Sequence, residues 1–150
     1  MLDNVVFFIA LLATALALAA ALAHALELPN KIQLGRDAYF TVQQNYRGWD
    51  RLAWLLLIQL LTTATVALRS RHSPAVLLSA LAAILCLLAA QTLFWSYTYP
   101  ANVATVNWTT QPDNWMTLRK QWEYSHAGGA AFQVLAVSFL IVAALARTGR

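Results

Sequence analysis

The stretch AVLLSALAAILCLLAAQTLF, residues Ala75–Phe94, decides the fold class, because it carries no charge and is long enough to cross a bilayer as one helix. Three more stretches share this character: Val5–Ala23, Leu52–Leu68 and Ala127–Ala146. Each approaches the ~20 residues that span a hydrocarbon layer of ~30 Å. Because 60% of the 150 residues are hydrophobic and 11% are charged, a soluble domain would leave large apolar surfaces in water.

These patterns predict an all-α membrane protein with one domain, an up-and-down bundle of four transmembrane helices. The expected spans cover about residues 5–28, 50–68, 75–97 and 113–146. Pro29 should end the first helix, and the following residues up to Trp49 resemble a short interfacial helix or lid. Ser73 is a suitable N-cap for the third helix. A polar segment, Ala101–Gln111, should separate the third helix from a long fourth helix that extends past the outer interface.

The distribution of charged residues predicts how the chain is oriented in the membrane. The first apolar stretch is preceded by Asp3 and is longer than a signal-peptide core, so we expect a retained anchor. The turn Arg69–His72 and the tail with Arg147 and Arg150 lack acidic residues, which favours a cytoplasmic location for both termini. The opposite loops also contain six basic residues, namely Lys31, Arg36, Arg47, Arg51, Arg119 and Lys120. The expected partners are the lipid bilayer and a lipophilic small molecule, with an oligomer left open and no nucleic acid, since no basic block occurs.

Tryptophan is distributed asymmetrically between the two membrane faces. All six tryptophans lie near the predicted outer ends of the helices or in the loops there: Trp49, Trp54, Trp95, Trp108, Trp115 and Trp122. An aromatic belt at the interface explains many such residues, but a belt normally forms at both faces. The asymmetry therefore also predicts an aromatic-lined cavity at the outer face.

Two short motifs at this face pair a carboxylate with an imidazole. His24 and Glu27 lie near the end of the first helix, and Glu123 and His126 lie within the fourth. A spacing of three residues places both groups on one helical face, and both motifs meet the membrane at nearly the same depth. Ionisable groups at that depth are costly unless they are paired, hydrated or functional.

Four interpretations of these motifs remain open at this point. Glu27 could pair with Lys31, and Glu123 with Arg119 or Lys120, as ordinary interfacial ion pairs. A metal centre of two histidines and two glutamates could hold iron or another transition metal; its ligands would be His24, Glu27, Glu123 and His126. The third interpretation is a metal-free acid–base pocket. The fourth, which is less favoured, is a haem bound between the two histidines.

The fourth helix presents a stripe that suits an aromatic ligand. At about 100° per residue, Trp115, Arg119, Trp122 and His126 share one face, with Glu123 beside it. Indole rings could stack on a flat ring, a guanidinium could bind an oxyanion, and an imidazole could act as a base.

The segment from Tyr97 to Ala130 resembles the small four-helix membrane proteins grouped with fungal anthrone oxygenases. The resemblance rests on Tyr99-Pro100-Ala101-Asn102, Asn107-Trp108, Pro112-Asp113-Asn114-Trp115, Leu118-Arg119 and Trp122-Glu123-Tyr124-Ser125-His126. It implies oxygenation of a polycyclic phenol at a methylene carbon beside a ketone. The implied roles are His126 as base with Glu123 in the catalytic set, Arg119 stabilising an enolate, and substrate binding by Trp115, Trp122, Trp108, Asn102 and Asn107.

The functional expectation is accordingly a membrane-embedded oxidoreductase, a monooxygenase of a lipophilic aromatic or quinol-like substrate bound at the outer face. The alternative is a non-catalytic membrane module that binds a quinone, lipid or haem, or serves as a partner subunit.

Overall fold

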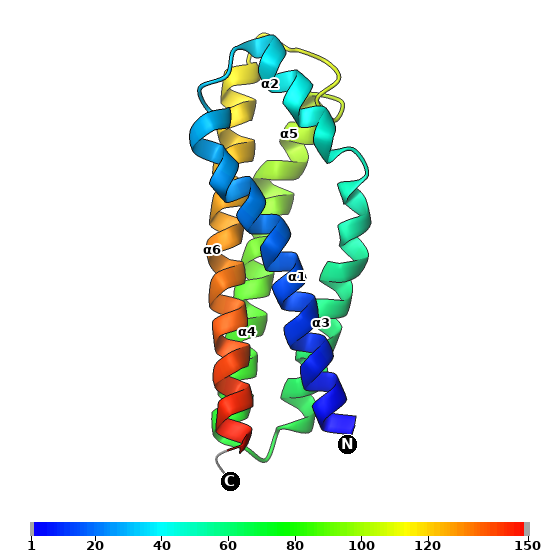
Figure 1. Ribbon diagram of the computed structural model, residues 1–150, viewed down its shortest axis with the longest axis vertical. Coiled ribbons are helices and arrows are strands. Elements are labelled where there is room, and N and C mark those ends of the chain that lie inside the picture. The colour runs from blue at the N-terminus through cyan, green and yellow to red at the C-terminus, as the bar shows by residue number, and fades with distance from the viewer. Residues whose placement is uncertain (1, 149–150) are drawn as a thin grey trace.

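The computed structural model describes residues 2–148 and shows an elongated helical bundle, with no strand among those residues (Figure 1). Four helical segments are long and apolar enough to cross a membrane, which confirms the predicted all-α membrane bundle. They are α1 (Leu2–Lys31), α3 (Leu52–Arg69) preceded by η2 (Trp49–Arg51), α4 (Pro74–Leu93) continued by η3 (Phe94–Thr98) and α5 (Tyr99–Ala104), and α6 (Trp115–Thr148).

The two ends of the bundle differ in construction. At one end, here called the terminal end, α1 begins, α6 ends and a short turn joins α3 to α4 (Figure 1). Arg150, which the sequence assigns to this face, lies outside the described residues. At the opposite end, here called the lid end, α2 (Arg36–Gln43) and η1 (Gln44–Tyr46) lie across the ends of the long helices. The predicted short helix between the first two spans is therefore confirmed.

Two predicted helix ends were wrong, and in both cases a proline is accommodated within a helix. Pro29 lies inside the last turn of α1, which continues to Lys31. A proline removes only its own N–H, and Ile32 N–H still donates to the Leu28 carbonyl at 3.0 Å. The third span also continues past Ala101, because a five-residue π-helix leads into α5. Pro100 lies in the first turn of α5, where a missing backbone N–H costs little.

Small side chains bring the long helices together toward the terminal end. Ala10, Ala80, Ala83 and Ala143 are almost fully buried in one cluster with Leu140. In lipid, small residues let helix backbones approach closely, and this close packing replaces the hydrophobic driving force available in water. One polar link crosses the middle of the bundle, where the Gln59 side chain of α3 donates to the Gln133 side chain of α6 at 2.8 Å.

Candidate functional site

A buried ion pair joins α1 to α6 at the lid end. The Lys31 Nζ atom lies 3.0 Å from Glu123 Oε1, and the two residues are 3% and 0% exposed. The Tyr39 hydroxyl of α2 donates to the same carboxylate oxygen at 2.9 Å, and the Gln43 amide donates to that hydroxyl at 2.9 Å. The carboxylate of Glu123 is thus shared by three helices, and α2 is fastened over the pair.

A second tyrosine extends this network toward Glu27. Lys31 Nζ donates to the Tyr46 hydroxyl at 3.0 Å, and that hydroxyl donates to the Glu27 carboxylate. Glu27 also lies 3.8 Å from Lys31, so the predicted ion pair between these two residues is confirmed. Burial, followed by the neighbouring carboxylates, raises the pKa of both the Tyr39 and the Tyr46 hydroxyls above the ordinary tyrosine value. Both phenols therefore stay protonated and act as donors.

The two imidazoles of the sequence motifs meet beside this network. The ring centroids of His24 and His126 are 4.2 Å apart with an interplanar angle of 30°, and Trp122 packs against both rings at 5.0 and 4.1 Å. Lys31 Nζ lies 4.4 Å from the centroid of the Trp122 ring. The spacing and depth of the motifs thus correctly predicted that the first and last helices bring their histidines together. His24 is 6% exposed, and its Nδ1 atom has no hydrogen-bond partner in the part of the chain that the structure describes.

The predicted four-ligand metal centre is not formed by the described residues. Among residues 2–148, no group of three or more histidine, cysteine, aspartate or glutamate side chains is arranged to hold a metal ion. The reason is that Glu123 bonds to Lys31 and Tyr39, while Glu27 bonds to Tyr46. The haem alternative also fails on geometry, because the rings of His24 and His126 are in direct contact and no macrocycle fits between them.

Arg119 fastens the lid and does not accompany His126. Its guanidinium donates to the Leu34 carbonyl at 2.6 Å and lies over the Trp115 ring at 4.6 Å. Arg119 precedes His126 by seven residues, a rise of about 10 Å along a helix. The predicted pairing of Glu123 with Arg119 or Lys120 is wrong, because the cation that contacts Glu123 is Lys31 of α1, which also lies over the Trp122 ring.

The predicted substrate-binding residues separate into a packed group and an exposed one. Asn102 Oδ1 accepts the indole N–H groups of Trp108 at 3.0 Å and Trp122 at 2.9 Å, which locks both rings. Asn107 is exposed and its backbone is left-handed, with φ +53°. The buried aromatic cluster of the lid end consists of Tyr39, Phe40, Trp108, Trp115 and Trp122 with Ala101 and Leu118.

This packing changes the meaning of the tryptophan asymmetry. The lid residues Tyr39 and Phe40 fill the space that the sequence assigned to an aromatic-lined cavity. Trp54 and Trp95 are instead 72% and 59% exposed on the bundle surface, as an interfacial belt requires. Two pockets stand out on the described residues, and none of the buried tryptophans lines either of them. One, of about 500 Å³, lies between η3 and the start of α6 and includes Lys120 and Tyr124; the other lies at the terminal end.

Sequence reasoning missed four members of the site: Lys31 as the partner of Glu123, and Tyr39, Gln43 and Tyr46 as the donors above it. A signal was present for Lys31, which follows Glu27 by four residues and His24 by seven and so shares their helical face. Tyr39, Gln43 and Tyr46 also recur at spacings of four and three residues. What the spacing could not give was the docking of this segment onto α6.

Fold and site together define a multi-pass helical membrane protein with a buried, lid-covered cluster of ionisable and aromatic side chains. Comparisons with protein families, with curated proteins and with solved structures find no match to this chain. The resemblance to anthrone oxygenases therefore stays a prediction drawn from the residues between Tyr97 and Ala130.

Proposed function

We propose that this protein is a membrane-embedded oxidoreductase, a monooxygenase of a lipophilic aromatic or quinol-like compound bound at the lid end. One observation supports this most directly: the contact between His24 and His126 beside the buried Lys31–Glu123 pair. Within this cluster, His24 Nδ1 and Glu123 Oε2 are buried and have no hydrogen-bond partner among residues 2–148. Buried polar atoms without partners are costly, so their retention favours a role in handling protons or a ligand.

The residues divide the work of such a reaction. His126 is the base that removes a proton, and the adjacent ring of His24 offers an unpaired nitrogen to receive or hold one. Lys31, in contact with the Trp122 ring that touches both histidines, supplies the positive charge that stabilises a developing enolate or phenolate oxygen. In this proposal Lys31 stabilises the oxyanion, a role that the resemblance assigned to Arg119. The Arg119 guanidinium is instead bonded to the Leu34 carbonyl next to the lid.

The proposed reaction needs only the organic substrate and dioxygen. His126 takes a proton from a methylene carbon that is conjugated with a ketone through an aromatic ring, as in an anthrone, and the resulting carbanion adds dioxygen to form a peroxide. Loss of water from the peroxide leaves a carbonyl group, so one oxygen atom ends in the product and the other in water. The carbon centre supplies all four electrons, and the balance requires no further reductant.

Access for a lipophilic substrate is favoured from the bilayer, between α1 and α3. The outer part of α3, residues 52–58, has no buried side chain, and the buried residues of α3 begin at Gln59. Figure 1 shows α1 beside α3 at the terminal end and beside α6 at the lid end. His126 itself is only partly shielded from its surroundings.

The proposed orientation places the terminal end in the cytoplasm and the lid end on the opposite, non-cytoplasmic side of the membrane. The basic turn between α3 and α4, with no acidic residue in it, supports this direction. A reporter enzyme fused after Arg150 should remain cytoplasmic, and an exported reporter would invert the orientation without changing the fold.

The enzymatic proposal is tested by oxygen consumption on an anthrone in lipid nanodiscs. Wild-type protein should consume one dioxygen per ketone formed, measured by an oxygen electrode and mass spectrometry. His126→Asn should lower the rate about 10²–10⁴-fold, the usual contribution of a positioned base. His72→Asn is the matched control, because His72 lies in the turn at the opposite end. Wild-type activity in a folded His126→Asn variant would refute the assignment.

The closed lid supports one second candidate, a non-catalytic module that binds a quinone or lipid. Tyr39 and Phe40 fill the aromatic cluster, Arg119 of α6 donates to the Leu34 carbonyl just before α2, and Gln44 of η1 donates to the Trp108 carbonyl. In the same assay this module would bind a quinone analogue, seen as quenching of tryptophan fluorescence, without consuming oxygen.

A further inference from the structure

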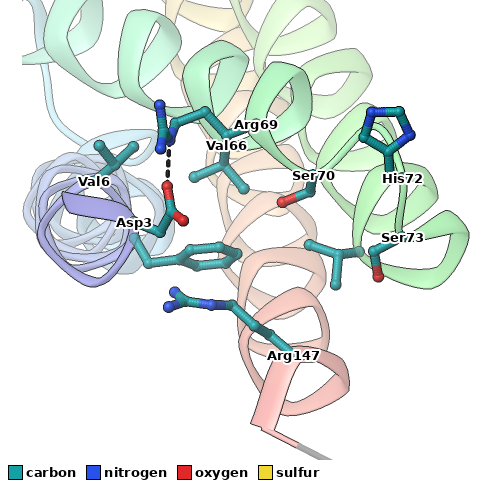
Figure 2. A pocket seen from close by; sticks show the side chains of 10 residues that line it. Asp3, Val6, Val66, Arg69, Ser70, His72, Ser73 and Arg147 are labelled. Carbon is teal, nitrogen blue, oxygen red and sulfur yellow. Dashed lines mark hydrogen bonds and ion pairs between the residues drawn. The ribbon is translucent and has the colours of Figure 1, made fainter. Parts of the chain in front are cut away.

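The terminal end contains a polar pocket that the proposed function does not use (Figure 2). Its volume is about 220 Å³, room for several water molecules at ~30 Å³ each. The first turns of α1, the end of α3, the start of α4 and the end of α6 form its walls. The lining residues are Asp3, Val6, Phe7, Val66, Arg69, Ser70, His72, Ser73, Val76 and Arg147.

Two arginines from different helices face this pocket. The Arg69 guanidinium donates its Nε–H to Asp3, and the Arg147 guanidinium donates to Asn4 and lies 4.9 Å from the Phe7 ring centroid. Figure 2 shows Arg69 and Arg147 on opposite sides of Asp3. Each guanidinium has five N–H donors, so these contacts hold both groups in position and leave most donors available.

Hydroxyl groups add further donors on the remaining side of the pocket. The Ser70 and Ser73 side chains make no hydrogen bond with another residue in the range 2–148, and both residues line the cavity. Ser73 occupies the N-cap position of α4, as the sequence predicted, but its side chain does not cap the helix. These hydroxyls are therefore free to bind a ligand.

Charge at this end favours an anionic ligand. Among the described residues it holds Arg69, Arg71 and Arg147 against one acidic side chain, Asp3. Arg69 and Asp3 are 44% and 50% exposed, so their pairing leaves both groups accessible from outside. Guanidinium forks match the oxygen geometry of phosphate and can bind it through two parallel hydrogen bonds.

We propose that this pocket binds a phosphate group through Arg69 and Arg147, with Ser70 and Ser73 as additional donors. Because the pocket lies where the apolar helices end, the phosphate of an anionic phospholipid headgroup fits its position, with the partly exposed Val6 available to the adjoining glycerol and acyl carbons. A soluble phosphate would use the same donors. The site is separate from the histidine cluster and does not depend on the proposed oxygenase activity.

The proposal is tested by thermal unfolding of the full-length protein in a phosphate-free maltoside detergent. Dioctanoyl phosphatidylglycerol, dioctanoyl phosphatidylcholine and inorganic phosphate are titrated separately, and the dissociation constant is taken from the shift of the unfolding midpoint. The variants are Arg147→Gln and Arg69→Gln. Arg71→Gln is the matched control, since it removes the same charge at the same end but does not line the pocket.

We expect saturable binding of phosphatidylglycerol by the wild type and Arg71→Gln, and about ten-fold weaker binding by each lining variant, as the loss of a charged hydrogen bond implies. Stabilisation by phosphatidylglycerol alone identifies a lipid site, and stabilisation by inorganic phosphate identifies a soluble anion. The proposal is overturned if no anion shifts the midpoint, or if Arg71→Gln weakens binding as much as Arg147→Gln. Midpoints without ligand show whether each variant is folded.

Discussion

The two ends of this bundle use the same kinds of charged groups in opposite ways. At the lid end, Lys31 and Glu123 form an ion pair that is almost completely buried and is covered by a helix. At the terminal end, Arg69 and Asp3 form an ion pair whose side chains remain about half exposed. Water screens the exposed pair, whereas the buried pair depends on its partners for all of its solvation.

The buried pair connects helices, whereas the exposed pair leaves charged groups that a ligand can reach. In the buried pair, three helices share one carboxylate, so a change in any partner is transmitted to α1, α2 and α6. In the exposed pair, the guanidinium keeps free donors and lines an open pocket. We infer that charge at the lid end fixes geometry around the two histidines, while charge at the terminal end remains adaptable.

The largest predicted effect follows from breaking the buried pair. Lys31→Met leaves Glu123 buried without its cation, and removal of one partner from such a pair typically costs about 3–5 kcal/mol. The double variant Lys31→Met/Glu123→Gln should recover much of this loss, because no uncompensated charge remains. Unfolding by sodium dodecyl sulfate, followed by circular dichroism, measures both values.

The matched control for this prediction lies at the other end. Asp3→Asn removes the acid of the exposed ion pair and should leave the unfolding transition unchanged within error. Equal destabilisation by Asp3→Asn and Lys31→Met would remove the distinction between the two ends.

The sequence alone was sufficient to locate the four spans and to predict that His24 and His126 lie close together. Lipid requires long apolar helices, so hydropathy alone located the four spans. Spacing and depth then placed His24 and His126 on faces that converge, because a helix fixes which residues share a face.

The remainder depended on tertiary packing that local patterns do not encode. Lys31 has Glu27 four residues away, so the sequence offered a local partner and concealed the distant Glu123. Arg119 shares a stripe with His126, but only the docking of α2 shows that the Leu34 carbonyl engages its guanidinium. The π-helix from Phe94 to Thr98 also contacts α6, where Thr98 and Ser125 share a hydrogen bond of 2.7 Å between residues far apart in the sequence.

The second prediction concerns the polar support of the aromatic cluster. Asn102→Ala removes the shared acceptor of Trp108 and Trp122 and leaves two buried indole N–H groups unpaired, at a cost of about 1–3 kcal/mol. Tryptophan fluorescence should also shift as the rings loosen. Asn107→Gly is the matched control, since Asn107 is exposed and glycine suits its positive φ. A loss of stability in the control alone would exclude this role for Asn102.

The third prediction is a loss of stability in alkali that originates at the lid. The pKa of Tyr39 is raised in the folded protein by burial and by Glu123, above the ordinary value of 10.0. The folded state therefore keeps the phenolic proton that the unfolded chain releases, so this contribution is intact below pH 10 and is lost as the pH rises further. The slope reaches at most about 1.4 kcal/mol per pH unit for this group.

Unfolding curves of the wild type and Tyr39→Phe at several alkaline pH values measure this slope. The variant is expected to start less stable, because it loses the hydrogen bonds to Glu123 and Gln43, yet to lose stability less steeply as the pH rises. Parallel curves for the two proteins would show that Tyr39 does not carry the effect.

The smallest predicted effect lies between the two ends, where α6 passes close to α4. A Cβ atom on Gly128 would lie 2.9 Å from Leu93 Cδ1, whereas a Cβ atom on Gly129 would meet nothing within 4 Å. Gly129→Ala should therefore gain up to about 1 kcal/mol from helix propensity, while Gly128→Ala should gain less or lose slightly, since the Leu93 side chain must move. Gly128 lies two residues after His126, so Gly128→Ala also tests whether the two ends are independent. If they are, the variant keeps its wild-type affinity for phosphate at the terminal end even where its oxygen consumption falls.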